Sequence, residues 1–216
     1  MLSHKIGVAA LVLSASVLAI ETANANIASG TTWEVATSIA QNATLANVPA
    51  SGPNATWSAP SDPLSFNSNS ASNGYTLGGF LATGGAFGVT YHGGAASTDT
   101  LDSTITEVTG TVTVTNGEVF NIAHDDGFSI QIGSFTFSDA GPTSAVTTPV
   151  TYTGATGNEM FKLAYGECCG PPAVLFVDLP LNSVPEPSTW AMMGLGFAGL
   201  GFVGFRRGRK ESVSIA

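Results

Sequence analysis

The chain has 216 residues, enough for one domain with targeting segments at its ends, and only 10% of these residues are charged. Lys162 is the only Lys or Arg between Lys5 and a C-terminal basic cluster that begins at Arg206, so the section after Glu21 and before that cluster carries a net charge of about −12. An acidic body of this kind repels nucleic acid and anionic lipid and attracts cations, which excludes nucleic-acid binding.

Residues 1–25 have the pattern of a secretion signal. Lys5 is followed by an apolar run from Ile6 to Ile20 and then by small residues up to Ala25. A basic start, a short apolar stretch and a small-x-small site are typical of a signal peptide that the Sec translocon and signal peptidase recognise. The run is short for a bilayer span of about 20 residues, so we expect cleavage between Ala25 and Asn26 rather than a retained anchor.

Residues 26–100 show a weaker pattern. The stretch 51–74 is rich in Ser, Asn, Pro and Gly, which predicts loops. From Leu77 to Tyr91, paired glycines stand among apolar residues but lack the Lys-Ser/Thr of a phosphate-binding loop. We expect these glycines to permit bulges or a close approach of strands. We assign residues 26–183 to one exported domain, whose strand pattern is clearest over residues 104–180.

From residue 104 onward, apolar residues recur at even spacing, as in β-strands. Asn116-Gly117 is a hairpin signal, and a two-residue loop there would separate the apolar residues onto opposite faces. A three-residue loop with Gly117 in the left-handed conformation pairs Val112 with Phe120 instead. We choose it because burial of one face fixes the register. The residues that would then share a face are Val112, Val114, Phe120 and Ile122.

Further strands follow at short intervals. A two-residue turn at Gly133-Ser134 predicts a second hairpin with five apolar residues on one face. Those residues are Phe128, Ile130, Ile132, Phe135 and Phe137. Residues 161–165 alternate as in another strand, and residues 173–179 are nearly continuously apolar, which is typical of a strand buried on both faces. The succession predicts an all-β fold, an antiparallel β-sandwich between an N-terminal signal helix and a C-terminal helix.

Two adjacent carboxylates, Asp125 and Asp126, lie in the turn between the two predicted hairpins. Their mutual repulsion needs a cation or hydrogen-bond donors to offset it, and hard oxygen ligands of this kind suit Ca²⁺. The spacing is not that of an EF-hand, and the alternative interpretation is a solvated turn. We name both residues as candidate Ca²⁺ ligands. Glu167 would join them if its loop lies at the same end of the sandwich.

Cys168 and Cys169 are the only cysteines of the chain. In an oxidising compartment they could form a disulfide with each other, remain as two thiols, or bridge to other molecules. We favour the bridge within the loop, in a structural role. Two adjacent cysteines make a poor zinc site, and His92 and His124 do not stand at zinc-ligand spacing.

No catalytic residues are assigned. The chain contains neither a Gly-x-Ser-x-Gly elbow nor a His-Glu-x-x-His motif, and neither cysteine has a base at a recognised spacing. His124, Asp125 and Ser129 are neighbours only because they occupy one turn and the start of one strand. We therefore expect that the protein is not an enzyme.

The C-terminal segment has three parts in a fixed order. Val184-Pro185-Glu186-Pro187 precedes an apolar run from Trp190 to Phe205, and a basic tail suited to the cytoplasm follows. The tail residues are Arg206, Arg207, Arg209 and Lys210. The run predicts a transmembrane helix over 190–205, although at 1.5 Å per residue it covers only about 24 Å. It also contains five glycines, so we expect transient rather than lasting anchoring.

Residues 184–210 closely resemble the PEP-CTERM sorting signal of Gram-negative bacteria that make exopolysaccharide. The resemblance implies export by Sec, processing by the membrane transpeptidase exosortase near the Pro-Glu-Pro, and a membrane-anchored precursor. The product would then reach the cell surface or extracellular matrix. An ordinary C-terminal anchor after a Pro-containing linker is the alternative interpretation.

The succession of motifs over residues 104–180 resembles PA14-like β-sandwich domains. Gly117-Glu118 and Asp125-Asp126-Gly127 carry the resemblance, together with the alternating strands that follow them. In adhesins of that group an Asp-Asp pair binds Ca²⁺, which in turn holds sugar hydroxyls. The resemblance assigns Ca²⁺ to Asp125 and Asp126 and suggests exopolysaccharide as a partner. The other residues of the adhesin site have no match here.

Two functions follow from these features. One is a Ca²⁺-assisted carbohydrate-binding or adhesive module. The other is a structural component of the exopolysaccharide or biofilm matrix, or of the envelope, that binds no ligand.

Overall fold

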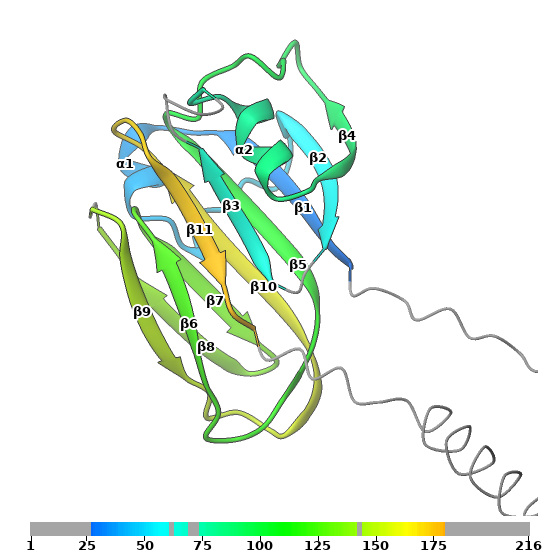
Figure 1. Cartoon of the computed structure of the whole chain (residues 1–216), viewed down its shortest axis with the longest axis vertical. Coiled ribbons are helices and arrows are strands. Elements are labelled where there is room, and N and C mark those ends of the chain that lie inside the picture. Colours follow the sequence, from blue (N-terminus) through cyan, green and yellow to red (C-terminus); the bar gives the residue numbers. More distant parts are fainter. Residues whose placement is uncertain (1–26, 61–62, 69–73, 142–143, 180–216) are drawn as a thin grey trace, which may run out of the picture.

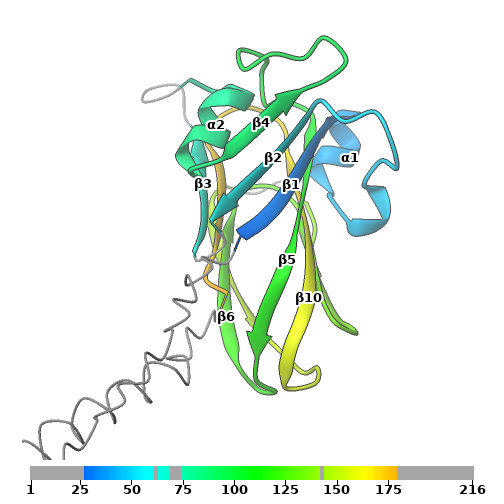
Figure 2. The ribbon, with the colours of Figure 1, turned by 90° about the vertical axis from the view of Figure 1, so that its right-hand side faces the viewer.

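The computed structural model describes residues 27–60, 63–68, 74–141 and 144–179, which form two antiparallel sheets packed face to face (Figures 1 and 2). The larger sheet has the strand order β4-β2-β1-β5-β10-β7-β8, and the smaller sheet has the order β3-β11-β6-β9. The predicted antiparallel β-sandwich is therefore confirmed.

The strands of the larger sheet are β1 (Ile27–Glu34), β2 (Ala55–Pro60), β4 (Phe87–Tyr91), β5 (Thr104–Val114), β7 (Phe128–Ile132), β8 (Phe135–Asp139) and β10 (Gly157–Glu167). Those of the smaller sheet are β3 (Leu64–Ser68), β6 (Val119–His124), β9 (Val146–Thr151) and β11 (Ala173–Val177). Three short helices connect them: α1 (Thr37–Gln41), the 3₁₀ helix η1 (Leu45–Asn47) and α2 (Leu77–Thr83).

The core lies between the inward faces of the two sheets. Along β10, Phe161, Leu163 and Tyr165 are buried while Lys162 between them is exposed, as the period-2 pattern predicts. Fully burying one such apolar side chain contributes about 1.5–3 kcal/mol. β5 pairs with β10 along the full length of both strands, so these two long strands hold the middle of the larger sheet together.

The hairpin predicted at Gly133-Ser134 is confirmed. Ile132 pairs with Phe135 and Ile130 with Phe137 across β7 and β8, and Gly133 has a φ of 56°. Phe135 and Phe137 are half-buried because β8 is the edge strand of the sheet.

The hairpin predicted at Asn116-Gly117 is wrong in its pairing. Glu118 N donates to Thr115 O at 3.0 Å and Gly117 has the expected left-handed φ of 86°, so the turn itself forms. It carries the chain from β5 in the larger sheet to β6 in the smaller sheet, where β6 pairs with β9 and β11. The four apolar residues predicted to share a face are all buried, but they reach the core from opposite sheets.

The loops predicted over residues 51–74 are also corrected, because this stretch contains β2 and β3. Ala55, Trp57 and Ala59 are buried along β2, and the Ser and Thr residues between them take the other face. β1 lies between β2 and β5 in the larger sheet. The N-terminal part of the body is thus built into the same two sheets as the rest.

The glycine-containing stretch 77–91 combines a helix with a strand. α2 begins after Thr76, whose side chain accepts a hydrogen bond from Gly79 N at 3.1 Å, so the expectation of strands was wrong there. The expected bulge does occur in β4, where Gly88 has a φ of 62° and the pairing with β2 shifts register.

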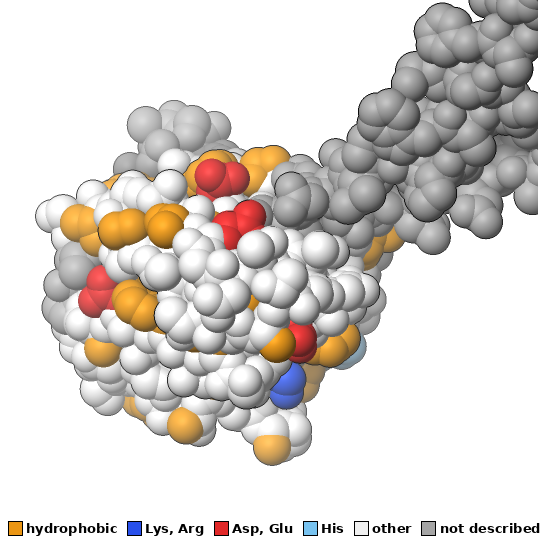
Figure 3. All heavy atoms as spheres, turned by 90° about the horizontal axis from the view of Figure 1, so that it is seen from below, with side chains coloured by type: hydrophobic (Ala, Val, Ile, Leu, Met, Phe, Trp, Pro, Cys, Tyr) orange, Lys and Arg blue, Asp and Glu red, His pale blue; other side chains and the backbone are white. Residues whose placement is uncertain are grey.

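β11 is central in the smaller sheet but is not buried on both faces as predicted. Ala173, Leu175 and Val177 face the core, whereas Phe176 is 37% exposed on the outer face. The strand runs from the end of the sandwich that carries the β6–β7 turn toward the opposite end (Figure 1), and Asp178 N beyond it donates to Asn121 O of β6 at 3.0 Å. Seen from that opposite end, the surface is mostly uncharged, with scattered apolar and acidic side chains (Figure 3).

The predicted signal peptide and the predicted helix over 190–205 lie outside the described residues. Within the described ranges, no helix has the length and hydropathy needed to cross a bilayer.

Candidate functional site

Three carboxylates meet at one end of the sandwich. Asp125 and Asp126 occupy the turn between β6 and β7, and Glu167 is the last residue of β10. These elements converge because β10 pairs with β7 and β6 pairs with β11. A carboxylate oxygen from each residue lies within 4.8 Å of the others, and all three residues are at least 95% buried. The three residues lie at the same end of the sandwich, which was the condition under which we expected Glu167 to join the predicted pair.

Two tyrosines supply hydroxyl groups to this cluster. Tyr165 Oη lies 2.5 Å from both Asp125 Oδ1 and Glu167 Oε2, and the Tyr75 hydroxyl donates to Glu167 Oε1. Val174 N also donates to Asp125 Oδ1, at 3.2 Å. Tyr165 has one hydroxyl proton, so it can donate to only one of its two carboxyl neighbours. Without a cation, the short contact with the other carboxyl group requires a proton on that group.

Asp126 is held from two sides. Its Oδ2 accepts a hydrogen bond of 2.6 Å from Cys168 N, and its main-chain oxygen lies 2.7 Å from His124 Nδ1. A carbonyl oxygen only accepts, so Nδ1 carries a proton in this arrangement. His124 Nε2 contacts Thr148 Oγ1 at 2.9 Å, and Thr148 donates to Asp139. Both ring nitrogens of His124 are therefore engaged, and the imidazole fixes the turn.

Burial raises the pKa of each carboxyl group. Desolvation, followed by the charge of Asp125, raises the pKa of Asp126 to about 6 and that of Glu167 to about 9. Desolvation also raises the pKa of Asp125, although hydrogen bonds from Tyr165 and Val174 oppose it. Within the described ranges Lys162 is the only Lys or Arg, and it lies about 16 Å from Glu167 along β10.

Asp125 and Asp126, both buried, line a pocket of about 510 Å³. Its other lining residues are Ser144, Ala145, Cys168, Cys169, Gly170, Pro171 and Pro172. Two acidic side chains among small uncharged residues make this pocket suitable for a cation and an uncharged polar molecule bound to it.

Cys168 and Cys169 are joined by a disulfide. Cys168 is buried, whereas Cys169 is exposed at the pocket and has a left-handed φ of 71°. The loop therefore contains the vicinal bridge, the first of the three alternatives considered for these residues.

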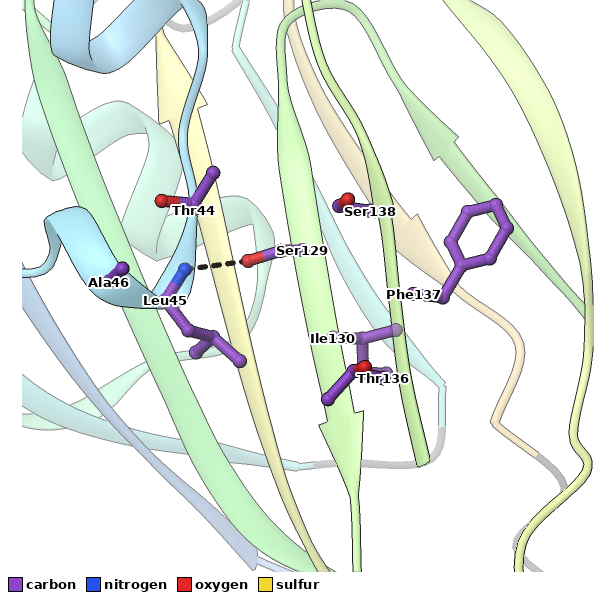
Figure 4. Close-up of a pocket in the computed structure, with 8 residues that line it drawn as sticks. All are labelled: Thr44, Leu45, Ala46, Ser129, Ile130, Thr136, Phe137 and Ser138. Atoms are coloured by element: carbon purple, nitrogen blue, oxygen red, sulfur yellow. Dashed lines mark hydrogen bonds between the residues drawn. The ribbon is translucent and has the colours of Figure 1, made fainter. Parts of the chain in front are cut away.

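A second pocket, of about 430 Å³, lies on the outer face of β7 and β8 beside the start of η1 (Figure 4). Leu45 N donates to Ser129 Oγ at 2.7 Å across its base. Thr44, Thr136 and Ser138 add hydroxyl groups, and no charged side chain lines it. The acidic pocket is therefore the better cation site of the two.

Two glycines allow the segment at α1 to lie directly against the acidic site. Gly127 N donates to Gln41 O at 3.3 Å, and Gly166 N donates to Gly127 O at 3.0 Å. A Cβ atom on Gly166 would lie 1.7 Å from Ala40 O, so only glycine fits there. This contact links residues more than 100 positions apart, and the local sequence pattern contains no signal for it.

Comparisons with known proteins agree with the features of the C-terminal segment and of the body. Residues 183–210 match the PEP-CTERM protein-sorting motif, which confirms the sequence resemblance. No curated protein matches the chain.

Two solved structures are similar to the body. One is a PA14 sugar-binding domain from an RTX adhesin, with 18% identity and a TM-score of 0.48, covering 70% of this chain and 87% of that one. The other is the PA14 domain of the MpAFP antifreeze protein, with 19% identity and a TM-score of 0.47, covering 74% and 85%. The chain is an exported protein with a C-terminal PEP-CTERM motif that implies exosortase processing, and its two-sheet body resembles PA14 domains.

Proposed function

We propose that the body binds Ca²⁺ through Asp125, Asp126 and Glu167, and that the bound ion holds hydroxyl groups of a carbohydrate in the extracellular matrix. The observation that carries this proposal is the group of three buried carboxylates that lie within 4.8 Å of one another. Burying several like charges is costly unless a cation or protons offset them.

The geometry supports Ca²⁺ in particular. The ion takes six to eight oxygen ligands, and three carboxylates supply between three and six of them. The pocket above Asp125 and Asp126 leaves room for water or ligand hydroxyls to complete the shell. Cys169, Pro171 and Pro172 at its rim are uncharged, which suits a neutral polyol better than an anion.

A structural role without a ligand is the second candidate, and a specific observation favours it. Tyr165, Tyr75, Cys168 N and Val174 N already donate to the carboxyl groups from within the fold. With protons in place of a cation, this network would fasten β10 and β11 to the turn at Asp125-Asp126. The domain would then be a stable component of the matrix or envelope.

Calorimetric titration of the exported protein with Ca²⁺ separates these functions. We expect one bound ion in the wild type and an affinity at least about 100-fold weaker in Asp126→Asn, which removes the charge but keeps the shape. Asp178→Asn is the matched control, because Asp178 is exposed and outside the site. A wild type that shows no heat of Ca²⁺ binding would favour the structural role. A glycan array with Ca²⁺ or with EDTA then tests the carbohydrate.

We also propose that the body is not an enzyme. The sequence lacks the common nucleophile and metalloprotease motifs. His124 is the histidine nearest to the acidic pocket, and it is buried with both ring nitrogens in contacts inside the fold. It is therefore poorly placed to act as a general base toward a molecule in the pocket.

The sorting motif leads us to propose the cell surface or extracellular matrix as the final location. Changing Pro185 and Pro187 to alanine is expected to leave uncleaved precursor in the membrane, because both residues belong to the Pro-Glu-Pro of the sorting motif and proline restricts the main chain as alanine does not. Immunoblots of membrane and extracellular fractions, with mass spectrometry of the new C-terminus, measure this. Asn182→Ala, outside the matched residues, should behave like the wild type. Normal release of the double variant would contradict the proposal.

A further inference from the structure

Both cysteines of the vicinal disulfide line the pocket that contains Asp125 and Asp126. Cys168 is 2% exposed, and its N–H donates to Asp126 Oδ2 at 2.6 Å. Cys169, the other half of the bridge, is exposed at the pocket. One sulfur is therefore accessible from solvent, and the adjacent residue directly positions a proposed ligand of the cation.

The bridge also fixes the main chain between two anchored points. Glu167 precedes it within the carboxylate cluster, and Gly170 N donates to Asp102 Oδ1 at 3.1 Å after it. Between them Cys169 has a φ of 71°, a left-handed conformation that is unfavourable by roughly 1–2 kcal/mol for a residue with a side chain. Once the covalent ring is open, Cys169 can return to a right-handed or extended conformation, which would move Cys168 N away from Asp126.

The buried sulfur adds a second effect. Cys168 Sγ lies 3.5 Å from Asp126 Oδ1. In the disulfide this sulfur has no hydrogen, so Oδ1 keeps its lone pairs for a cation. In a thiol the same sulfur carries a proton and can donate it to that oxygen. Reduction therefore places a competing donor against a proposed Ca²⁺ ligand.

We propose that the Cys168–Cys169 disulfide is a redox-sensitive control of the acidic site, and that a dithiol reductant weakens cation binding by opening it. A thiolate of the dithiol attacks Cys169 Sγ, the bond between the two sulfurs breaks, and Cys168 Sγ leaves with the electron pair and takes a proton. The second thiol of the reductant then releases Cys169 as a thiol and becomes a cyclic disulfide. The protein is reduced by two electrons and the dithiol is oxidised by two. The inference rests on the proposed Ca²⁺ site.

The test compares the exported protein before and after treatment with dithiothreitol. Ca²⁺ affinity is measured by calorimetry, and hydrogen exchange at the Cys168 amide is measured in parallel. On reduction we expect the affinity to fall about tenfold and the amide to exchange at least about tenfold faster. Reoxidation should restore both values. Because the chain has only two cysteines, the variant Cys168→Ala/Cys169→Ala is a complete control and should not respond to the reductant.

Three outcomes would decide the matter. Equal exchange at Cys168 in both redox states would overturn the proposal, whether or not Ca²⁺ binds. Faster exchange with unchanged Ca²⁺ affinity would overturn the control of binding while leaving the Ca²⁺ site intact. If the oxidised protein binds no Ca²⁺ at all, the proposed function fails and the control of cation binding fails with it, whereas the exchange rates still show whether the bridge orders the loop.

Discussion

Gly166→Ala is expected to lower the free energy of unfolding by about 3 kcal/mol or more. The new Cβ atom would lie 1.7 Å from the carbonyl oxygen of Ala40 and 2.6 Å from its carbon. These are main-chain atoms, which cannot turn aside as the end of a flexible side chain can. The segment at α1 would have to move away from β10. The hydrogen bond from Gly127 N to Gln41 O beside the acidic site would then be lost.

Urea denaturation measures this effect, with Gly93→Ala as the control. Gly93 has a φ of 63°, and a Cβ atom added to it would meet no atom within 4 Å, so the variant carries backbone strain of about 1 kcal/mol and no clash. Equal losses in the two variants would show that the α1 segment yields easily at Gly166. A larger loss at Gly166 would establish that α1 is fastened to the site by this close approach.

The stability of the Ca²⁺-free protein is expected to fall as pH rises from about 4 to about 9. The folded-state pKa values of Asp126 and Glu167 are about 6 and about 9, raised from 3.8 and 4.5. The folded protein therefore binds more protons than the unfolded chain in this range, and the stability that these protons give is complete below the unfolded pKa values. The part due to Asp126 is lost between about pH 4 and pH 6 and the part due to Glu167 between about pH 4.5 and pH 9, by about 2 kcal/mol or more in total.

Calcium should reverse this dependence, because the ion binds the deprotonated carboxylates. Urea denaturation at pH 5, 7 and 8.5, in EDTA or in Ca²⁺, would reveal a stabilisation by Ca²⁺ that grows with pH. Glu167→Gln keeps the shape and removes the titration, so in EDTA it should abolish the part of the decline above pH 6. Stability that rises with pH in EDTA would contradict the assignment of protons to these carboxyl groups.

The two hairpin predictions show what periodicity can and cannot predict. At Gly133-Ser134 the turn type and the alternation were sufficient, because both strands belong to the same sheet. At Asn116-Gly117 the same reasoning identified the turn and the buried residues but not the pairing. Alternation indicates which side chains face the core, but in a sandwich two sheets face the same core. Which of the two sheets a strand joins depends on pairing with strands that are distant in the sequence.

The residues of the candidate site likewise fall into those with a local sequence signal and those without one. Asp125 and Asp126 were predictable because adjacent acids in a turn are a local feature. Tyr165 and Glu167 also gave a local signal, since residues two apart in a strand share a face, and a glutamate on the buried face needs a partner. The roles of Tyr75, which reaches Glu167 across 92 positions, and of the α1 segment depend on tertiary packing alone.

The path of β11 has a mechanical consequence. The strand lies between β3 and β6. It begins just after Pro172 of the acidic pocket and runs away from the pocket toward the C-terminus. If the pocket binds a polysaccharide, as we propose, a force between the pocket and the C-terminal end of β11 would act along the strand axis. The hydrogen bonds of an antiparallel sheet lie across that axis, so they would be loaded together in shear rather than opened one after another. We therefore expect the domain to resist a pulling force applied between the pocket and the C-terminal end of β11.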